Sequence, residues 1–285
     1  MLAPAITDEI EDALRRQAFA ARRLVLVSPP SARKRGRCVY RVDLADGRTL
    51  KARRLESAAA ARHLVALRAG IDAAFAPVVA RHDAVLLEAW IEGTLLTALD
   101  PEARAAEAGA LLARLHATTV ATAATALDVG ALRDRARAEL GTVAATGKIT
   151  AAERASLARL LERHPPSVAA SVLVHRDFCA ENMLVDPQGR MHVIDNEWLD
   201  VAPAGLDLGR TFSRWPMSRA AWARLLGAYR AAAGVDAGPL VFWKLATALT
   251  SACLRLQQAP ARLDVSLGLL RRAAAAPDDV LEDPS

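Results

Sequence analysis

Asp177, Asn182 and Asp195 have the residue types and the spacing that phosphoryl transfer requires. They stand in the order His-Arg-Asp-x-x-x-x-Asn, and the second Asp follows thirteen residues after the Asn. In phosphoryl transfer, one carboxylate orients and deprotonates a hydroxyl, while an Asn and another Asp hold Mg²⁺ against the phosphates. The pattern therefore indicates a magnesium-dependent transfer of phosphate to a hydroxyl.

A β-hairpin is expected directly after Asn182. Two short apolar runs flank Pro187–Arg190, which has the composition of a hairpin turn. If Met183 pairs with Ile194, then Asn182 and Asp195 become opposite neighbours at the open end, roughly 5 Å apart. One hard cation could then touch both side chains.

These residues resemble the aminoglycoside phosphotransferase and choline kinase-like family of small-molecule kinases. The family pattern is His-Gly-Asp with Asn five residues after the Asp, then Ile-Asp-x-Glu, then Asp-Leu-Ala or Asp-Leu-Gly. The chain has His175–Asp177, Asn182, Ile194–Glu197 and Asp207–Gly209.

The resemblance implies a role for each matching residue. Asp177 is expected to be the catalytic base, Asn182 and Asp195 the ligands of Mg²⁺, and Asp207 a structural acid that braces the loop. Arg176 departs from the usual Gly and makes the triplet look like that of a protein kinase.

The resemblance also implies an α+β, two-lobed protein-kinase-like fold. Residues 1–90 would form a nucleotide-binding N-lobe, a small antiparallel sheet with one helix. Residues 91–285 would form a larger, mostly helical C-lobe that carries the catalytic hairpin and binds the acceptor.

Lys51 is expected to bind the phosphates of the donor. The chain has four lysines against 33 arginines, so a Lys in the third expected strand suggests a site that suits a compact ammonium group. The strand lysine of kinases, which grips the α- and β-phosphates, is such a site. Glu56, at the head of the next expected helix, is the nearest acidic partner in the sequence. A solvated surface lysine is the alternative.

The remaining donor contacts leave little trace in the sequence. Residues 86–93 resemble the hinge of the family, where backbone groups at Ala89, Trp90 and Ile91 would pair with the nucleotide base, ATP or GTP. No glycine-rich phosphate-binding motif is present, and the basic loop Ser28–Arg37 either contacts phosphates or is an exposed segment.

Periodicity and turn residues predict the elements around these motifs. Strands are expected at about 24–27, 38–44, 48–53, 78–81, 85–91 and 172–174. Helices are expected at about 5–20, 57–69, from 101, 128–144, 150–163, 218–233, 238–257 and 263–275.

Composition excludes several classes of protein. Hydrophobic residues make up 53% of the chain, which excludes wholesale disorder, and no apolar run approaches the ~20 residues of a membrane span. Three widely spaced cysteines argue against a disulfide framework. The N-terminus lacks a basic-then-apolar signal, so we expect a cytoplasmic protein, a monomer or dimer with no membrane partner.

The net charge of +5 does not indicate nucleic-acid binding. Residues 1–90 hold 16 Lys and Arg against 10 Asp and Glu, whereas the remainder holds 21 against 22. The positive excess lies where a nucleoside triphosphate is expected, although a solvated basic face is the commoner explanation of such a bias.

The sequence disfavours three other functions. A protein kinase is disfavoured because only 11 residues separate Asp195 from Asp207, which leaves no long activation segment. A nucleotide-binding regulator without turnover is disfavoured by the intact set of Asp177, Asn182 and Asp195. A zinc site at His175 and Cys179 lacks the paired ligands of zinc motifs.

The sequence does not identify the acceptor. Polycationic aminoglycosides prefer an acidic pocket, yet residues 199–285 hold 8 Asp and Glu against 10 Lys and Arg. The expected acceptors are an aminoglycoside or other antibiotic, or a hydroxylated metabolite such as an amino alcohol.

Overall fold

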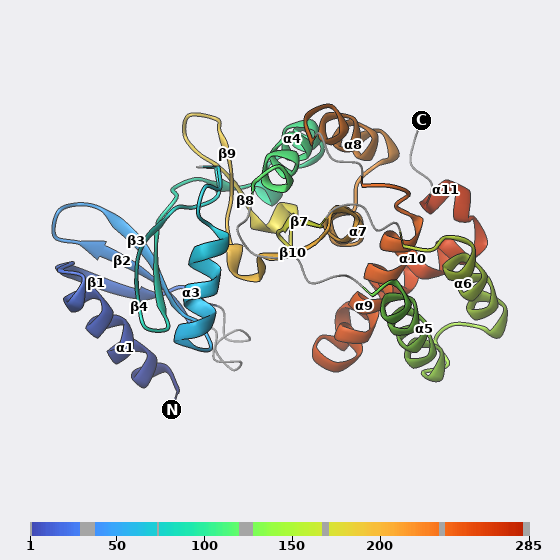
Figure 1. Cartoon of the computed structure of the whole chain (residues 1–285), viewed down its shortest axis with the longest axis horizontal. Coiled ribbons are helices and arrows are strands. Elements are labelled where there is room, and N and C mark those ends of the chain that lie inside the picture. Colours follow the sequence, from blue (N-terminus) through green and yellow to red (C-terminus); the bar gives the residue numbers. More distant parts are fainter. Residues whose placement is uncertain are drawn as a thin grey trace. The chain divides into compact units, whose positions relative to one another are not determined.

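The structure of the chain is a computed structural model that describes residues 2–28, 38–72, 74–119, 128–166, 171–233 and 237–281. Contacts divide it into two compact units (Figure 1). The first comprises Met1–Thr94 with Leu184–Glu197, and the second comprises Leu95–Met183 with Trp198–Ser285. The basic loop Ser28–Arg37 lies outside the described residues from position 29 onward.

The fold is mixed α+β, as predicted. The strands are β1 (Ala21–Leu26), β2 (Val39–Leu44), β3 (Thr49–Arg54), β4 (Val78–His82), β5 (Val85–Ala89), β6 (Thr94–Leu95), β7 (Ser171–Val174), β8 (Met183–Val185), β9 (Met191–Val193) and β10 (Asp200–Pro203). The α-helices are α1 (Leu2–Arg16), α3 (Ala58–Leu67), α4 (Ala105–His116), α5 (Val129–Ala145), α6 (Ala151–Arg163), α7 (Ala204–Arg214), α8 (Arg219–Ala233), α9 (Val241–Gln258), α10 (Leu263–Ala275) and α11 (Pro277–Leu281). Short 3₁₀ helices are η1 (Leu96–Ala98), η2 (Glu102–Arg104), η3 (Ala180–Asn182), η4 (Asn196–Trp198) and η5 (Pro260–Arg262).

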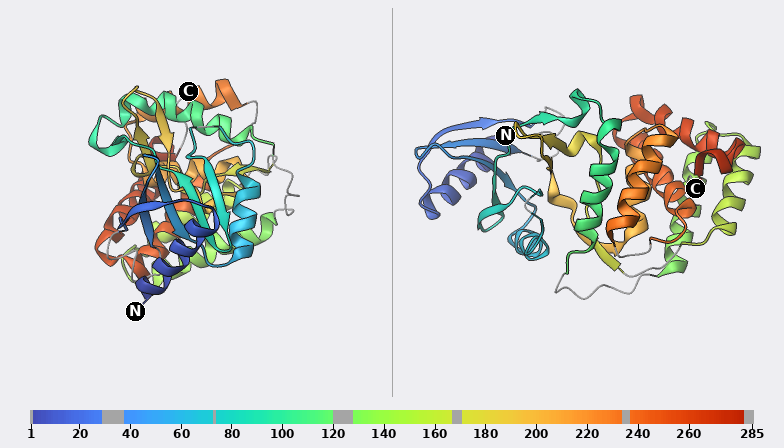
Figure 2. Two further views of the ribbon diagram at one scale, coloured as in Figure 1. Left: turned by 90° about the vertical axis from the view of Figure 1, so that its left-hand side faces the viewer. Right: turned by 90° about the horizontal axis from the view of Figure 1, so that it is seen from above.

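The first unit is built on an antiparallel sheet in the order β1-β2-β3-β5-β4. Helix α1 packs on it (Figures 1 and 2), because Ile10 and Leu14 join one core with alternate residues of the strands. In β3, Leu50 and Ala52 belong to that core. Since successive strand residues point to opposite faces, Lys51 and Arg53 project from the other face.

The register of the sheet sets the partner of Lys51. Strand β3 pairs with β5 rather than with its neighbour in sequence, β4, and this pairing places Lys51 directly opposite Glu88. Leu87 packs into the core beneath α1, so Glu88 lies on the same face as Lys51. Two charged residues thus meet on the face that α1 leaves uncovered.

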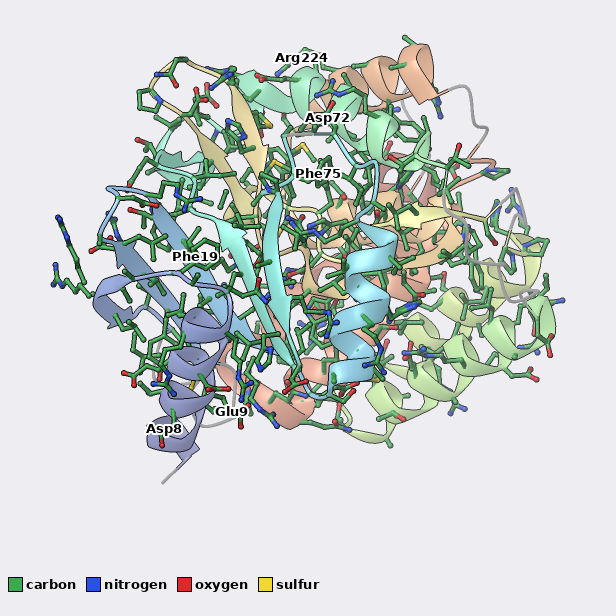
Figure 3. All side chains as sticks on the ribbon, turned by 60° about the vertical axis from the view of Figure 1, so that its left-hand side comes forward. Asp8, Glu9, Phe19, Asp72, Phe75 and Arg224 are labelled. Atoms are coloured by element: carbon green, nitrogen blue, oxygen red, sulfur yellow. The ribbon has the colours of Figure 1, made fainter. Side chains whose placement is uncertain are left out.

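The predicted hairpin is present as β8 and β9, but its open end differs from the prediction. Strand β9 ends at Val193, so the expected pair of Met183 with Ile194 is not part of the ladder. Val193 instead forms a parallel bridge with Phe75, which is labelled in Figure 3. The Val193 amide donates to Ala74 O at 2.8 Å. Two residues after this bridge, Asp195 has a left-handed backbone, φ 64°.

The second unit is mostly helical around the short β7–β10 ladder. Helices α4 and α8 lie side by side (Figure 1), and Gly109 permits their close approach: an added Cβ would lie 2.1 Å from Leu225 O. Helices α7 and α9 pack equally closely, since Trp243 of α9 fills the space next to Gly205 of α7. In the described part of the chain, no helix has the length and apolar character to cross a membrane.

Candidate active site

Asp207 braces the loop that carries Asp177, as the sequence predicts. Its Oδ2 accepts a hydrogen bond from the His175 backbone N–H and its Oδ1 one from the Arg176 N–H, both at 2.6 Å. The side chain is fully buried. Burial alone would raise the pKa of Asp207, but the hydrogen bond and charge of His116, with those of His175, lower it below the ordinary value. The bracing group is therefore an anion.

His116 completes this brace from α4. Its Nε2 lies 3.2 Å from Asp207 Oδ2, and its Nδ1 lies 2.9 Å from the hydroxyl of Tyr229. The imidazole is buried, so His116 is a packing residue rather than a catalyst. One buried network thus connects α4, α7 and α8 to residues 175–182, called the catalytic loop below after the predicted role of Asp177.

Arg176 adopts a left-handed backbone conformation with φ 64°. Glycine adopts this region without strain, which accounts for the glycine usual at this position in the family that the motif resembles. The Arg176 side chain forms an ion pair with Asp200 at 3.0 Å, and both groups are half exposed.

Asp177 and Asn182 are brought together by the loop. The amide of Asn182 donates to Asp177 Oδ2 at 3.0 Å and to Asp177 O at 2.8 Å. Asp177 Oδ1 accepts from Arg214 Nη1 at 2.9 Å, and Arg210 Nη2 lies 3.6 Å away. Both carboxylate oxygens are therefore held in place.

The two arginines were missed in the sequence. Four polar residues recur at helical spacing on α7 and therefore lie along one side of the helix: Asp207, Arg210, Thr211 and Arg214. Thr211 Oγ1 donates to Phe178 O at 2.9 Å, so this side of the helix faces the catalytic loop. This spacing was the available signal, but helix α7 was not among the expected elements.

In the first unit, Lys51 contacts two carboxylates. Its Nζ lies 3.3 Å from Asp195 Oδ1 and 3.9 Å from Glu88 Oε2. Glu56 is exposed and is not brought to Lys51. Lys51 and Asp195 belong to the first unit, whereas Asp177 and Asn182 belong to the second.

Glu88 is the centre of a buried charged cluster that the sequence did not reveal. Arg53 Nε lies 3.2 Å from Glu88 Oε2, and Arg68, which caps α3, also pairs with Glu88. Arg53 Nη1 extends the cluster to Glu197 at 3.0 Å. Burial alone would raise the pKa of Glu88, but the charges of Arg53, Lys51 and Arg68 lower it to about 2.

The predicted hinge keeps two of its backbone groups within the fold. The amide of Ala89 donates to Pro77 O at 2.9 Å, and that of Trp90 donates to Thr49 O at 3.2 Å. The Ile91 amide donates no such bond within the described part of the chain.

The donor set expected for Mg²⁺ fits that ion. Asn182 uses its amide nitrogen within the loop, which leaves its oxygen as a ligand atom. Asp195 uses Oδ1 for Lys51, which leaves Oδ2. Carboxylate and amide oxygens are the ligands that Mg²⁺ prefers. Over the ranges described, no group of three or more His, Cys, Asp or Glu side chains gathers to form a metal site by itself.

Cys179 does not suit a zinc site. Its thiol is buried, and burial together with the charge of Asp177 raises its pKa to about 11. Zinc binds the thiolate, which is disfavoured here. The protonated thiol lies 3.8 Å from Arg214 Nη2 and packs in the catalytic loop.

Comparisons with known proteins identify the family. A model described as "Phosphotransferase enzyme family" matches residues 46–243. No relative among curated proteins matches the sequence.

Solved structures with the same fold include three small-molecule kinases. The macrolide 2′-phosphotransferase of Brachybacterium faecium is 21% identical, with a TM-score of 0.64 over 98% of this chain and 99% of that one. A choline/ethanolamine kinase family protein of Mesorhizobium loti is 19% identical, with a TM-score of 0.62 over 98% and 96%. A spectinomycin phosphotransferase solved with ADP and spectinomycin is 12% identical, with a TM-score of 0.60 over 96% and 98%.

Proposed function

Because the chain belongs to the phosphotransferase enzyme family, we propose that it transfers the γ-phosphate of a nucleoside triphosphate to the hydroxyl of a small molecule. The observation that carries this proposal is the fixed orientation of Asp177. Asn182 and Arg214 each hold one of its carboxylate oxygens, and Asp207 accepts hydrogen bonds from the backbone amides of His175 and Arg176.

In the proposed reaction, Asp177 accepts the proton of the acceptor hydroxyl as that oxygen attacks the γ-phosphorus. A new bond forms between the hydroxyl oxygen and phosphorus, and the bond from phosphorus to the bridging oxygen of the leaving diphosphate breaks. A positioned base of this kind contributes roughly 10²–10⁴ in rate. The rate contribution of the base depends on its orientation, which the hydrogen bonds of Asp177 fix.

On the donor side, we propose Lys51 as the group that binds the α- and β-phosphates. Its pairing with Glu88 and Asp195 holds the ammonium group above the face of β3 that α1 leaves uncovered. Ala89, Trp90 and Ile91 would lie against the nucleotide base. Glu56 has no part in this arrangement.

Asn182 and Asp195 are our proposed ligands of Mg²⁺. When bound, the ion would neutralise the charge that develops on the phosphate oxygens during transfer. The chain's own contribution is to present one amide oxygen and one carboxylate oxygen that no donor among the described residues occupies.

The names of the similar proteins suggest a range of acceptor classes and no single compound. Their names refer to macrolides, spectinomycin and choline or ethanolamine, so an aminoglycoside or other antibiotic, or a hydroxylated metabolite such as an amino alcohol, is the starting panel.

The test is a screen of hydroxyl compounds with ATP and with GTP, in which nucleoside diphosphate release and phosphorylated product are both measured. Product formation that depends on Mg²⁺ supports the proposal. Tight nucleotide binding without product for any acceptor would instead favour a regulator without turnover.

A further inference from the structure

Arg53 lies on the same face of β3 as Lys51 but is closed to solvent. The two residues are two positions apart in the strand, so their side chains project from the same side of the sheet. The Arg53 side chain is 2% exposed, whereas that of Lys51 is 14% exposed. A ligand in solvent therefore meets Lys51 and not Arg53, so the role of Arg53 lies in its contacts within the fold.

The Arg53 guanidinium connects the sheet to the segment that follows β9. Its Nη1 donates to Glu197 Oε2 at 3.0 Å and lies 3.6 Å from Asp195 Oδ1. Its Nε lies 3.2 Å from Oε2 of Glu88, a residue of β5. All four residues belong to the first unit. One buried cation thus joins two strands of the sheet to both acids of the segment 195–197.

Regular structure does not fix Asp195. Strand β9 ends at Val193 and η4 begins at Asn196, so Asp195 lies in neither element. Its backbone has φ 64°, a region that is uncommon for residues other than glycine. The Asp195 side chain is 43% exposed, and its Oδ1 lies 3.3 Å from Lys51 Nζ as well as near Arg53. The two cations of β3 therefore hold this carboxylate by one oxygen.

Of these two cations, Arg53 is the one that nucleotide binding leaves in place. Lys51 is the proposed ligand of the α- and β-phosphates, so its ammonium group would be shared between the phosphates and Asp195. Arg53 is buried and keeps its contacts with Glu88 and Glu197. It can therefore hold Asp195 Oδ1 both with and without nucleotide.

We propose that Arg53 is a positioning residue of the metal site: it holds Asp195 by Oδ1 and so keeps Oδ2 available to Mg²⁺. The inference rests on the proposed phosphotransfer, in which Asp195 is a ligand of that ion. Groups that hold a metal ligand in place typically change metal affinity by about 10–100-fold when they are replaced. In this role Arg53 contacts neither the nucleotide nor the ion.

Charge and position make opposite predictions for Arg53. A cation near Asp195 repels Mg²⁺, so loss of the Arg53 charge alone would strengthen metal binding. Loss of the orientation of Asp195 would weaken metal binding. A purely structural role in the buried cluster would lower stability and leave the metal affinity of the folded protein unchanged. Metal affinity therefore distinguishes the three accounts.

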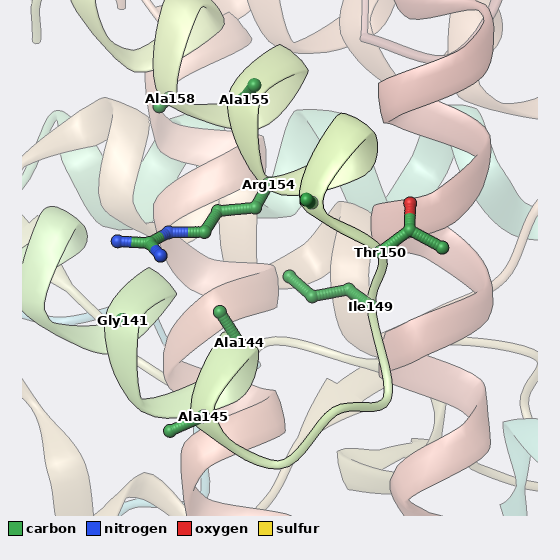
Figure 4. A pocket seen from close by; sticks show the side chains of 9 residues that line it. Gly141, Ala144, Ala145, Ile149, Thr150, Arg154, Ala155 and Ala158 are labelled. Carbon is green, nitrogen blue, oxygen red and sulfur yellow. The ribbon is translucent and has the colours of Figure 1, made fainter.

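Two cavities in the second unit offer no competing cation site. One of about 550 Å³ lies between α5 and α6, and its lining carries Arg154 and no carboxylate (Figure 4). The other, of about 340 Å³, includes Glu102 and Glu181. Glu181 binds Arg214 at 2.8 Å, and Glu102 binds Ser218. These cavities therefore do not compete with Asp195 for Mg²⁺.

The test measures how far Mg²⁺ tightens nucleotide binding. Calorimetry gives the Kd of the β,γ-methylene analogue of ATP or of GTP, whichever binds more tightly, in excess Mg²⁺ and in EDTA. The ratio of the Kd in EDTA to the Kd in Mg²⁺ reports metal affinity in the complex, because the coupling between two ligands is reciprocal. The measurement needs no turnover and no acceptor.

Arg53→Lys keeps the buried charge but replaces the planar guanidinium, which contacts Glu88 and Glu197 together, with a single ammonium group. We expect this variant to reduce the Kd ratio about fivefold or more, with the Kd in EDTA within about threefold of wild type. Arg53→Met is the second variant, should Arg53→Lys fail to fold, and it should reduce the ratio about threefold or more. Urea denaturation followed by circular dichroism shows which variants are folded.

Arg54→Lys is the matched control. Arg54 is the next residue of β3 and makes a half-exposed ion pair with Glu9 of α1 at 2.7 Å. The Kd ratio of this variant should stay within about twofold of wild type. Asp195→Asn is the reference for the proposed ligand itself and should reduce the ratio about fivefold or more.

A folded Arg53→Lys or Arg53→Met protein that keeps or raises the wild-type ratio would overturn the inference. If Asp195→Asn lowers the ratio in the same experiment, the proposed metal ligand stands and only the role of Arg53 falls. A ratio of one in wild type, or an unchanged ratio in Asp195→Asn, would refute both. If the ratio falls in the Arg53 variants while no acceptor is phosphorylated, the positioning role stands and the proposed reaction falls.

Discussion

Glu88→Gln is expected to destabilise the first unit strongly and to change its response to acid. The wild-type Glu88 side chain is 1% exposed and lies among three cations. Their side-chain exposures are 2% for Arg53, 3% for Arg68 and 14% for Lys51. Glutamine keeps the shape of the side chain but removes its charge. The change therefore leaves buried cations without their counter-ion.

The size of the effect follows from the lowered pKa of Glu88. A fall from the ordinary value of 4.5 to about 2 corresponds to about 3 kcal/mol in the free energy of unfolding, since each pKa unit is worth about 1.4 kcal/mol. Loss of one partner from a buried ion pair costs a similar amount, roughly 3–5 kcal/mol.

The lowered pKa also fixes the direction of the pH dependence. Because the folded-state pKa lies below the unfolded one, the unfolded chain binds the extra proton as the pH falls, and stability falls with it. The contribution of Glu88 is fully present above pH 4.5 and is lost as the pH falls toward 2. The Glu88→Gln variant should lack the part of the acid-induced loss of stability that protonation of Glu88 causes.

Urea denaturation followed by circular dichroism at pH 7, and again at steps down to pH 3, measures both effects. Glu9→Gln is the matched control, because Glu9 makes a half-exposed ion pair with Arg54 at 2.7 Å (Figure 3), and such pairs contribute about 0–1 kcal/mol. If Glu88→Gln lay within 0.5 kcal/mol of wild type at pH 7 (about the spread of a neutral surface substitution), the buried cluster would not stabilise the sheet as reasoned.

Two further predictions concern the second unit. Gly109→Ala should lower the free energy of unfolding by about 2 kcal/mol, because the added Cβ would meet Leu225 O. The control Gly227→Ala, at an exposed helical position with no atom within 4 Å of the added Cβ, should raise the free energy of unfolding by about 1 kcal/mol. Equal effects of the two substitutions in thermal melts would contradict the close packing of α4 on α8. Arg214→Gln should reduce kcat about tenfold or more with the nucleotide KM unchanged, because Asp177 loses the group that holds its Oδ1. Unchanged kcat in steady-state assays would show that Arg214 does not orient the base.

Much of the fold could be predicted from the sequence because its signals are local. The strands of the sheet alternate between core and exposed positions, and Asp128 and Thr150 cap α5 and α6 where the sequence changes from loop to helix. The contact between Asp177 and Asn182 spans only five residues of one loop. The brace from Asp207 was implied by the resemblance to the kinase family, since it reaches a backbone amide 32 residues earlier in the chain.

The contacts that the sequence did not reveal depend on tertiary structure. Glu56 is near Lys51 in sequence, but Glu88 meets it in space, because β3 pairs with β5 and the register places the two residues opposite each other. The role of Arg214 depends on how α7 packs against the catalytic loop. No local pattern encodes strand order or helix packing, so these partners appear only in the structure.

The central claim is that Asp177 orients and deprotonates the acceptor hydroxyl. Its most direct test is the rate of γ-phosphate transfer by wild type and by Asp177→Ala, with the acceptor that wild type uses best and with circular dichroism to show that both are folded. We predict that kcat falls at least about hundredfold in Asp177→Ala while nucleotide KM stays within about twofold. Wild-type turnover by a folded Asp177→Ala protein would contradict the account.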